Sequence, residues 1–269
     1  MMAKQIVDEI REMSFMQMES VNVRNIIFGA GKPKVCVPIV GKTKEEILLQ
    51  AEQIVQKEPD CIELRIDWFE SFYDWSLVDE VLQELRTIIG DIVLLFTFRT
   101  TGEGGEATIH YEEYYRLCRH VCESGYIDML DVEAFMQDDL LKEICEVAHS
   151  HNVKVVASNH DFEKTPSEED IVKRLKFMEH AGADLPKIAV MPLCETDVLT
   201  LLSATLRYYE TGGKQPIITM SMGEMGVISR VCGGTFGSAM TFAAVGKTSA
   251  PGQISIDDEK IILQVLNGE

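Results

Sequence analysis

The chain has 269 residues, of which 46% are hydrophobic and 26% are charged, proportions typical of a soluble globular protein with one large core or two small ones. Its formal net charge of -19 argues against a nucleic acid or an anionic membrane as a partner. Apolar runs such as Ile92–Phe96 are far too short to span a bilayer, and the N-terminus lacks the apolar core of a signal peptide.

The predicted elements begin after residues 1–20, which are rich in methionine and charge and which we expect to form a loosely ordered extension. Residues 21–30 hold short apolar runs that predict a small hairpin. Apolar strand-like runs then alternate with amphipathic helical patterns. The predicted strands are Val35–Val40, Cys61–Asp67, Ile92–Arg99, Ile127–Glu133, Lys154–His160, Lys187–Met191, Ile217–Met222 and Ser238–Val245. The predicted helices between them include Lys44–Gln56, Trp75–Ile89, Tyr111–Ser124, Asp138–His151, Ser167–His180 and Glu195–Tyr209.

The ends of several predicted helices carry residues suited to capping. Acid or hydroxyl residues suited to an N-cap or a first turn stand at Thr43, at Ser167 before Glu168 and Glu169, and at Thr196 with Asp197. Glycines that can end a helix follow at Gly90, Gly125, Gly182 and Gly212. These signals support the helix boundaries given by the apolar patterns.

The alternation of eight strands with helices favours an α/β fold, a single closed parallel (β/α)8 TIM barrel. We expect this catalytic domain to span residues 21–269, with the hairpin closing the bottom of the barrel. A doubly wound open sheet is the alternative, but no Gly-x-Gly-x-x-Gly follows the first predicted strand, where a dinucleotide-binding fold needs it. No linker rich in proline, glycine or serine divides the chain, so one domain is expected.

Charged residues inside the predicted strands indicate a functional site. Glu63, Arg65 and Asp67 alternate along one strand and therefore share a face. Further charged residues lie in or at the ends of the following strands, at Arg99, Asp131, Glu133, His160 and Lys187. In a closed barrel these side chains converge at the C-terminal mouth, where this fold builds its active sites. Any one of them could form a structural ion pair, for example Glu63 with Arg65 or Arg99, but five strands in phase favour a catalytic mouth.

Lys187 stands out because it lies beside Ile188, Val190 and Met191 in an apolar strand. An ammonium group is costly to desolvate, so a lysine in such a place tends to lose its proton and becomes a nucleophile toward carbonyls. Repulsion from the nearby Arg65 and Arg99 would also favour the neutral amine. The simpler interpretation is a strand-edge lysine that extends to solvent.

A histidine and a glutamate complete the candidate catalytic set. His160 titrates near neutrality and could take a proton from a carbon atom and return it to a leaving hydroxyl. Glu103, on a glycine-rich loop after the third strand, could orient and charge that histidine. The plainer interpretations are a strand-end histidine bonded to the backbone and a solvated loop acid.

These residues lie in segments that resemble the type I 3-dehydroquinate dehydratases, the Schiff-base-forming enzymes of the shikimate pathway. The matching segments, in the expected order, are Glu63–Asp67, Phe96–Arg99 with Glu103–Gly105, Ser158–Phe162, Leu185–Pro192, Ile218–Gly223, Gly226–Arg230, Phe236–Ala239 and Ser249–Gln253. The resemblance runs from about Val21 to the C-terminus. It implies a lyase that dehydrates 3-dehydroquinate to 3-dehydroshikimate for chorismate and aromatic amino acid biosynthesis.

The resemblance also implies a role for each matching residue. Lys187 corresponds to the lysine that attacks the C3 ketone, His160 to the base for the C2 proton and the acid for the C1 hydroxyl, and Glu103 to the acid that positions the histidine. Arg230 corresponds to the residue that binds the substrate carboxylate, a task suited to a bidentate guanidinium. The remaining substrate-binding positions are Glu63, Arg65, Arg99, Ser249, Gln253, Met220 and Phe242. Without the resemblance, Arg230 is a surface arginine, Ser249–Gly252 a turn, and Met220 and Phe242 core residues.

Two positions depart from the family pattern. Pro38 stands where some members have a serine, and we expect backbone contacts or water to substitute for it. Gly234 replaces an acid common in its loop, which puts a local ion pair in doubt. Every residue that the chemistry needs is present.

The resemblance implies 3-dehydroquinate as the small-molecule substrate, a homodimer, and no cofactor or metal, because the lysine supplies the electron sink. Seven cysteines without paired spacing favour a reducing, cytoplasmic location, and Cys118 with Cys122 makes a poor zinc site. Two other classes stay open. One is a class I aldolase, whose substrates often carry a phosphate that could bind near Gly223, Gly226, Gly233 and Gly234. The other is a catalytically silent barrel that serves as a binding module.

Overall fold

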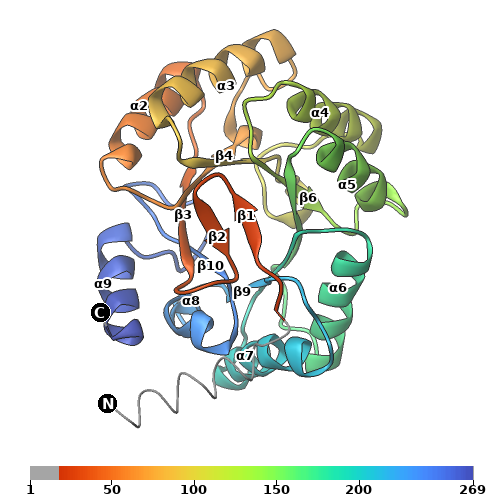
Figure 1. The fold of residues 1–269 in the computed structure, drawn as a ribbon, viewed down its shortest axis with the longest axis vertical. Coiled ribbons are helices and arrows are strands. Elements are labelled where there is room, and N and C mark those ends of the chain that lie inside the picture. Colours follow the sequence, from red (N-terminus) through yellow and green to blue (C-terminus); the bar gives the residue numbers. More distant parts are fainter. Residues whose placement is uncertain (1–17, 269) are drawn as a thin grey trace.

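The computed structural model describes residues 18–268, and its centre is a ring of eight parallel strands (Figure 1). The strands are β3 (Lys34–Ile39), β4 (Cys61–Arg65), β5 (Val93–Thr97), β6 (Met129–Glu133), β7 (Lys154–Asp161), β8 (Leu185–Val190), β9 (Ile218–Ser221) and β10 (Met240–Phe242). They follow the order β10-β3-β4-β5-β6-β7-β8-β9, and a parallel bridge between Ile217 and Ser238 joins the two ends. The predicted barrel is therefore confirmed, and the doubly wound alternative is wrong.

Helices surround the ring on its outside (Figure 1). They are α2 (Lys44–Val55), α3 (Trp75–Ile89), α4 (Tyr111–Glu123), α5 (Leu140–Ser150), α6 (Glu168–His180), α7 (Glu195–Glu210), α8 (Val227–Cys232) and α9 (Ile256–Asn267). The six predicted helices are present, with ends that differ from the prediction by at most two residues. We did not predict α8 or α9, because α8 has 6 residues, too few to show a helical repeat, and α9 follows a segment interpreted as a lid.

The capping predictions hold at most helix ends. Thr43 and Ser167 accept hydrogen bonds from the third backbone amide of their helices. The four predicted glycines adopt positive φ angles at or just after the helix ends, at Gly90, Gly125, Gly182 and Gly212. Thr196 and Asp197 lie in the first turn of α7, which begins at Glu195 with Cys194 at the N-cap position.

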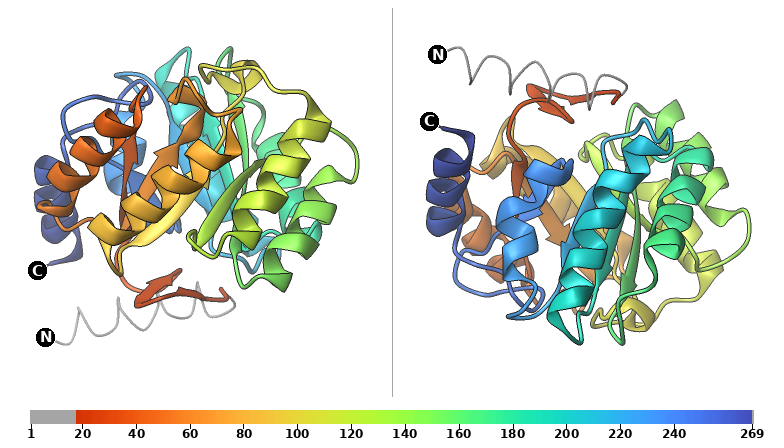
Figure 2. Two further views of the ribbon diagram at one scale, coloured as in Figure 1. Left: turned by 90° about the horizontal axis from the view of Figure 1, so that it is seen from above. Right: turned by 90° about the horizontal axis from the view of Figure 1, so that it is seen from below.

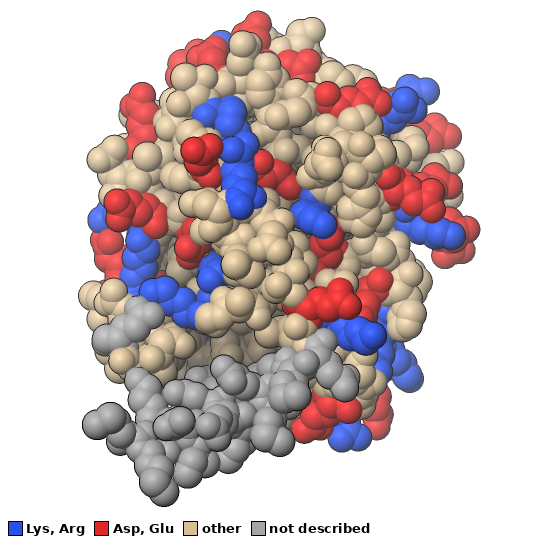
Figure 3. All heavy atoms as spheres, viewed as in Figure 1, with Lys and Arg blue, Asp and Glu red and all other residues tan. Residues whose placement is uncertain are grey.

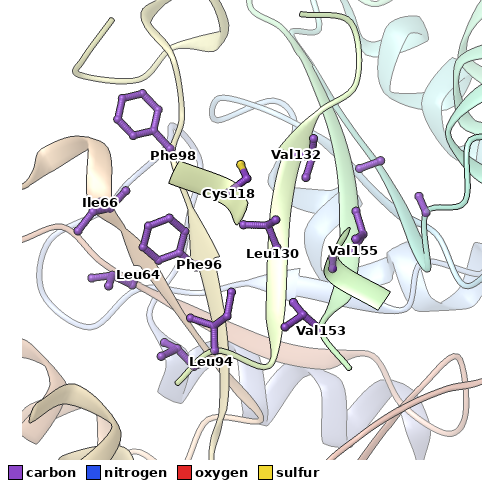
Figure 4. Close-up of a cluster of buried hydrophobic side chains, with 14 of the residues drawn as sticks. Leu64, Ile66, Leu94, Phe96, Phe98, Cys118, Leu130, Val132, Val153 and Val155 are labelled. Carbon is purple, nitrogen blue, oxygen red and sulfur yellow. The ribbon is translucent and has the colours of Figure 1, made fainter. Parts of the chain in front are cut away.

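The strands have two faces of different chemistry. Outward-facing side chains of successive strands pack with the helices into one large apolar layer, part of which is drawn in Figure 4. Its labelled members come from β4 to β7, adjoining residues and α4, and are Leu64, Ile66, Leu94, Phe96, Phe98, Cys118, Leu130, Val132, Val153 and Val155. Inward-facing side chains form a second apolar cluster at the start of the strands, which includes Cys36, Cys61, Val93, Met129 and Leu185. Further along the same strands the inner face becomes polar.

The predicted hairpin consists of β1 (Val21–Val23) and β2 (Ile26–Phe28), which pair antiparallel. It lies across the end of the barrel at which the strands begin (Figure 2). Val21, Val23 and Phe28 are buried and belong to the inner apolar cluster, so the hairpin closes the bottom of the barrel as predicted. The predicted extension, residues 1–20, lies largely outside the described residues. The barrel interior is therefore accessible from the mouth at the opposite end, where the strands end.

Acidic and basic side chains are interspersed over the hairpin face of the molecule (Figure 3). In the part of the chain that the structure covers, no helix is both long enough and apolar enough to cross a membrane. The described chain thus presents a mixed polar surface around a buried apolar double layer.

Candidate active site

A pocket opens at the C-terminal mouth of the barrel. All eleven residues assigned from the sequence line it: Glu63, Arg65, Arg99, Glu103, His160, Lys187, Met220, Arg230, Phe242, Ser249 and Gln253. They come from strands, loops and one helix that are far apart in the sequence, and the closed ring brings them together. Five further residues contribute to the wall: Gly104, Phe162, Ala189, Met222 and Ala250.

Lys187 projects from the middle of β8 into this pocket, and the residue is only 4% exposed. Its Nζ lies 3.2 Å from Oδ2 of Asp131 on β6 and 4.5 Å from the centre of the Phe242 ring on β10. Repulsion from Arg65 and Arg99 was predicted to keep the amine neutral. The contact with Asp131 instead gives it a direct carboxylate partner, so repulsion from arginines is offset by an ion pair.

Asp131 and Glu133 hold Arg99 from the neighbouring strand. The guanidinium of Arg99 donates to Oδ1 of Asp131 at 2.6 Å, to Oε1 of Glu133 at 3.1 Å and to Oγ of Ser158 at 2.9 Å. Burial lowers the pKa of Arg99, but the two carboxylates raise it well above its usual value. Burial likewise raises the pKa of Asp131, yet Arg99 and Lys187 bring it below its usual value. Arg99 and Asp131 are therefore both charged at neutral pH, and the arginine is fixed in place.

His160, near the end of β7, is clamped by Glu103 from the short helix η2 (Thr101–Glu103). Oε2 of Glu103 accepts hydrogen bonds from the backbone N–H of His160 at 3.0 Å and lies 2.9 Å from its Nδ1, and Oε1 accepts from Asn159. Burial and the cations Arg99 and Lys187 lower the pKa of His160 well below its usual value. Burial raises the pKa of Glu103 to about 7 against the attraction of Arg99. The imidazole is therefore neutral at pH 7, with Nε2 left for the pocket.

The acid–base pairs on β4 differ from those suggested by the sequence. The strand ends at Arg65, so Asp67 lies in the short helix η1 (Ile66–Trp68) and does not continue the strand face. Its carboxylate accepts two hydrogen bonds from Arg65, each 2.8 Å long. Glu63 accepts from Thr97 at 2.8 Å rather than pairing with an arginine. Asp67 thus fixes the arginine, and Glu63 keeps lone pairs free for a ligand in the pocket.

Arg230 closes the side of the pocket next to β9. It extends from α8, is 3% exposed, and donates to the sulfur of Met220 at 3.4 Å and to the carbonyl of Pro251 at 3.0 Å. Pro251 belongs to the loop in which Ser249 and Gln253 bond each other twice, at 2.9 and 3.0 Å. The guanidinium therefore holds the loop against the mouth.

Two glycines next to Glu103 allow close approach. A Cβ atom added at Gly105 would lie 1.9 Å from the carbonyl oxygen of Arg99, and one at Gly104 would lie 2.3 Å from the ring of Phe162. The absence of side chains at Gly104 and Gly105 lets the loop pack closely against the mouth, where it places the carboxylate of Glu103. Phe162 lies in a segment that matches the family but had no predicted role, and Asp131 was predicted only to lie at the mouth.

Gly234 and Pro38, which depart from the family pattern, lie in different surroundings. At Gly234, a Cβ atom would lie 2.2 Å from Cγ of Pro33, so an acidic side chain does not fit without movement of the proline. Pro38 pairs in register with Glu63, beside the pocket. Within residues 18–268, no group of three or more His, Cys, Asp or Glu side chains is arranged to hold a metal ion.

Comparison with known proteins agrees with this geometry. The sequence model of the family described as "Type I 3-dehydroquinase" matches residues 35–269. The 3-dehydroquinate dehydratase of Clostridioides difficile is 51% identical over 247 residues, which cover 92% of this chain and 97% of that protein. The enzyme of Listeria monocytogenes is 50% identical over 250 residues, 93% of this chain and 99% of the relative.

Solved structures give the same result. The crystal structure of type I 3-dehydroquinate dehydratase from Clostridium difficile with covalent modified comenic acid has a TM-score of 0.91 at 50% identity and covers 94% of this chain and 99% of its own. The 3-dehydroquinate dehydratase of Geobacillus kaustophilus has a TM-score of 0.90 at 38% identity, with 93% and 97% covered. The chain therefore belongs to the type I 3-dehydroquinase family.

Proposed function

We infer that the chain is a 3-dehydroquinate dehydratase, a hydro-lyase that removes water from 3-dehydroquinate to give 3-dehydroshikimate in the shikimate pathway. The observation that carries this inference is one pocket that holds a buried lysine, a neutral histidine and a buried arginine. Family membership over residues 35–269 supports it. The same membership speaks against the class I aldolase and against the silent binding module, because the catalytic set is complete.

Lys187 is proposed as the nucleophile. Its amine attacks the C3 ketone, a carbinolamine forms, and loss of water leaves an iminium that joins Nζ to C3. The iminium draws electrons from the neighbouring C2–H bond and so acidifies that proton. The lysine itself supplies the electron sink, so the proposed chemistry calls for neither a metal nor an organic cofactor.

His160 is proposed as the base and then the acid. Its neutral imidazole takes the C2 proton, the electron pair moves into the enamine, and the C1 hydroxyl leaves as water when the imidazolium returns a proton. Hydrolysis of the product iminium frees the lysine. Glu103 supports this cycle because it fixes Nδ1, stabilises the transient imidazolium and leaves Nε2 directed to the substrate.

The remaining residues are proposed to bind the substrate. Arg230 takes the carboxylate, and the polar wall holds the hydroxyls and the keto end of the ring through Glu63, Arg65 and Arg99. Met220 and Phe242 contact the apolar face of the ring. The loop with Ser249 and Gln253 closes over the substrate and excludes water, as lids of this kind do.

Borohydride trapping tests the covalent step. Reduction of the enzyme in the presence of 3-dehydroquinate should add to the peptide that contains Lys187 the mass of the substrate or product less one oxygen atom, because imine formation releases water and reduction adds two hydrogens. Lys187→Ala should lose both the adduct and turnover while its circular dichroism stays unchanged. His160→Ala should still trap the imine but turn over slowly. Substantial dehydration by Lys187→Ala would contradict the Schiff-base route.

The setting of the enzyme is also a proposal. A cytoplasmic location is favoured by seven cysteines that are all free thiols in the structure. We propose a homodimer, by analogy with the family, and we expect neither a nucleic acid nor a membrane as partner because the net charge is -19. Sedimentation of the purified chain tests the dimer.

A further inference from the structure

Helix α9 carries a buried carboxylate to which the proposed reaction assigns no role. Glu259 is 0% exposed, and neither of its carboxylate oxygens has a hydrogen-bond partner among residues 18–268. Burying an unpaired carboxylate is costly, so such a group needs a physical explanation in its surroundings.

The surroundings of Glu259 include the arginine proposed to bind the substrate carboxylate. Helices α8 and α9 pack against each other, and the charge of Arg230 on α8 acts on Glu259. Burial raises the pKa of Glu259 to about 7 against the opposing charge of Arg230. Burial lowers the pKa of Arg230 to about 10, and Glu259 opposes that shift. The two charges therefore stabilise each other, although they form no ion pair within 4.0 Å in the described chain.

The other contacts of Arg230 do not neutralise its charge. The guanidinium donates to the sulfur of Met220 and the carbonyl of Pro251, which are both uncharged, and its Nε has no partner in the described structure. Oγ1 of Thr241 is likewise without a partner there. Glu259 does not line the pocket, whereas Arg230 does. The acid thus reaches the arginine from the protein side, and a ligand reaches it from the pocket.

We propose that Glu259 is a positioning residue that supplies the counter-charge of Arg230 in the empty enzyme and competes with the substrate carboxylate for it. The proposal rests on the proposed function, in which Arg230 binds that carboxylate. Its consequence is a limit on the affinity for both substrate and product, because 3-dehydroshikimate keeps the carboxylate. If Glu259 served packing alone, removing its charge would not raise the affinities for substrate and product together.

The test compares the wild type with Glu259→Gln at pH 8, where the carboxylate of the wild type is ionised. The KM for 3-dehydroquinate and the inhibition constant of 3-dehydroshikimate should both fall about six- to sixteenfold, the effect of one unit charge across roughly 10 to 15 Å at an effective dielectric constant of about 20. We expect kcat to change less than KM. Glu259→Asp, which retains the charge, should keep both constants near those of the wild type.

Asp257→Asn provides the matched control. Asp257 lies two positions earlier in α9 and pairs with Lys57 at the surface, where its side chain is 62% exposed. Removal of this charge should leave both constants within about twofold, because exposed charges are screened. If Glu259→Gln does not fold, Glu259→Leu, of similar volume, carries the same expectation.

The outcomes separate the two proposals. A wild-type enzyme that does not dehydrate 3-dehydroquinate refutes the proposed function. An active wild type whose charge-removing Glu259 variants leave both constants unchanged, or raise them, refutes the counter-charge proposal alone.

Discussion

The Nζ of Lys187 lies 3.2 Å from Oδ2 of Asp131, a carboxylate that is fully buried on the inner face of β6. The second oxygen of Asp131 accepts hydrogen bonds from Arg99 and from Ser158, each 2.6 Å long. One carboxylate therefore connects the proposed nucleophile with the arginine of the neighbouring wall. Both cations share its charge, and both are almost fully buried.

Replacing Asp131 with asparagine should damage both stability and activity. The amide cannot neutralise Lys187 and Arg99, and breaking a buried ion pair on one side costs about 3 to 5 kcal/mol. Misplacement of the amine and the arginine should lower kcat/KM on the order of 100-fold. Urea unfolding and steady-state kinetics on the same preparation measure the two effects.

Asp128→Asn is the matched control for this prediction. Asp128 precedes β6 at the bottom of the barrel and pairs with Arg24 and Arg86 at 2.6 and 2.7 Å. The control should lose stability but keep kcat/KM near the wild-type value, because its ion pairs lie at the end opposite the pocket. An equal loss of activity in both variants would mean that Asp131 acts through stability alone.

The pH dependence of catalysis should change when Glu103 loses its charge. In the wild type the first proton enters the Glu103–His160 pair near pH 7, the value to which burial raises the pKa of Glu103, so kcat/KM should fall as the pH drops below 7. In Glu103→Gln the proton must go to His160, whose pKa lies well below its usual value because of burial, Arg99 and Lys187. The acid limb should therefore move to lower pH while the maximal rate falls.

Measuring kcat/KM of both enzymes from pH 5 to 9 gives the position of the acid limb and the maximal rate. The position of the acid limb is the informative quantity, since a simple loss of orientation lowers the rate at every pH without moving it. An acid limb that stays near pH 7 in Glu103→Gln would assign the titration to another group.

The sequence predicted the barrel well because its two faces differ in chemistry along each strand. In β4, Ile62 and Leu64 face the helices, whereas Cys61, Glu63 and Arg65 face the interior. This period of two, apolar at the start and charged at the end, is readable without coordinates. It predicted that Arg65, Arg99 and Lys187 lie at the mouth, whereas positions such as Arg230 and Ser249 were assigned only from the resemblance to the family.

The sequence did not predict which charges pair. Glu63 and Asp67 are equally close to Arg65 along the chain. Arg65 pairs with Asp67 because the strand ends at Arg65 and the chain turns there. The burial of Glu259 was not predicted because α9 itself was not predicted. Within this helix Glu259 lies on the same buried face as Ile256 and Leu263.

Gly105 is predicted to be irreplaceable for the geometry of the Glu103 loop. A Cβ atom there would lie 1.9 Å from the carbonyl oxygen of Arg99, a backbone atom that cannot rotate away. Gly105→Ala should therefore displace the loop, lower kcat/KM on the order of 100-fold and cost roughly 2 to 4 kcal/mol of stability. Gly102→Ala is the control, because its Cβ would meet Oγ1 of Thr100 at 3.4 Å, an ordinary contact. Equal kinetics for the two variants would argue against the close approach.

The hairpin at the bottom of the barrel should contribute to stability without affecting catalysis. Phe28 is 0% exposed and packs with inward-facing residues such as Cys61 and Met129, so Phe28→Ala leaves a cavity in the inner cluster. Loss of a buried phenylalanine side chain costs about 3 to 5 kcal/mol, and the melting temperature should fall by roughly 10 °C for a chain of this size. The kcat/KM at 25 °C should remain near the wild-type value, since the pocket lies at the other end of the strands.

Ile27→Ala tests whether this loss comes from the buried ring or from the hairpin as a whole. Ile27 is the neighbouring residue of the same strand and is 43% exposed, so its truncation should change the free energy of unfolding by no more than about 0.5 kcal/mol. Differential scanning calorimetry of the two variants and the wild type gives the comparison. If Phe28→Ala melted like Ile27→Ala, the ring would not be a part of the core, and the barrel interior would have to be stable with its bottom open. If Phe28→Ala lowered kcat/KM in proportion to its stability, the two ends of the barrel would be coupled, because a cavity under the apolar layer would then loosen the strands that carry Lys187 and His160.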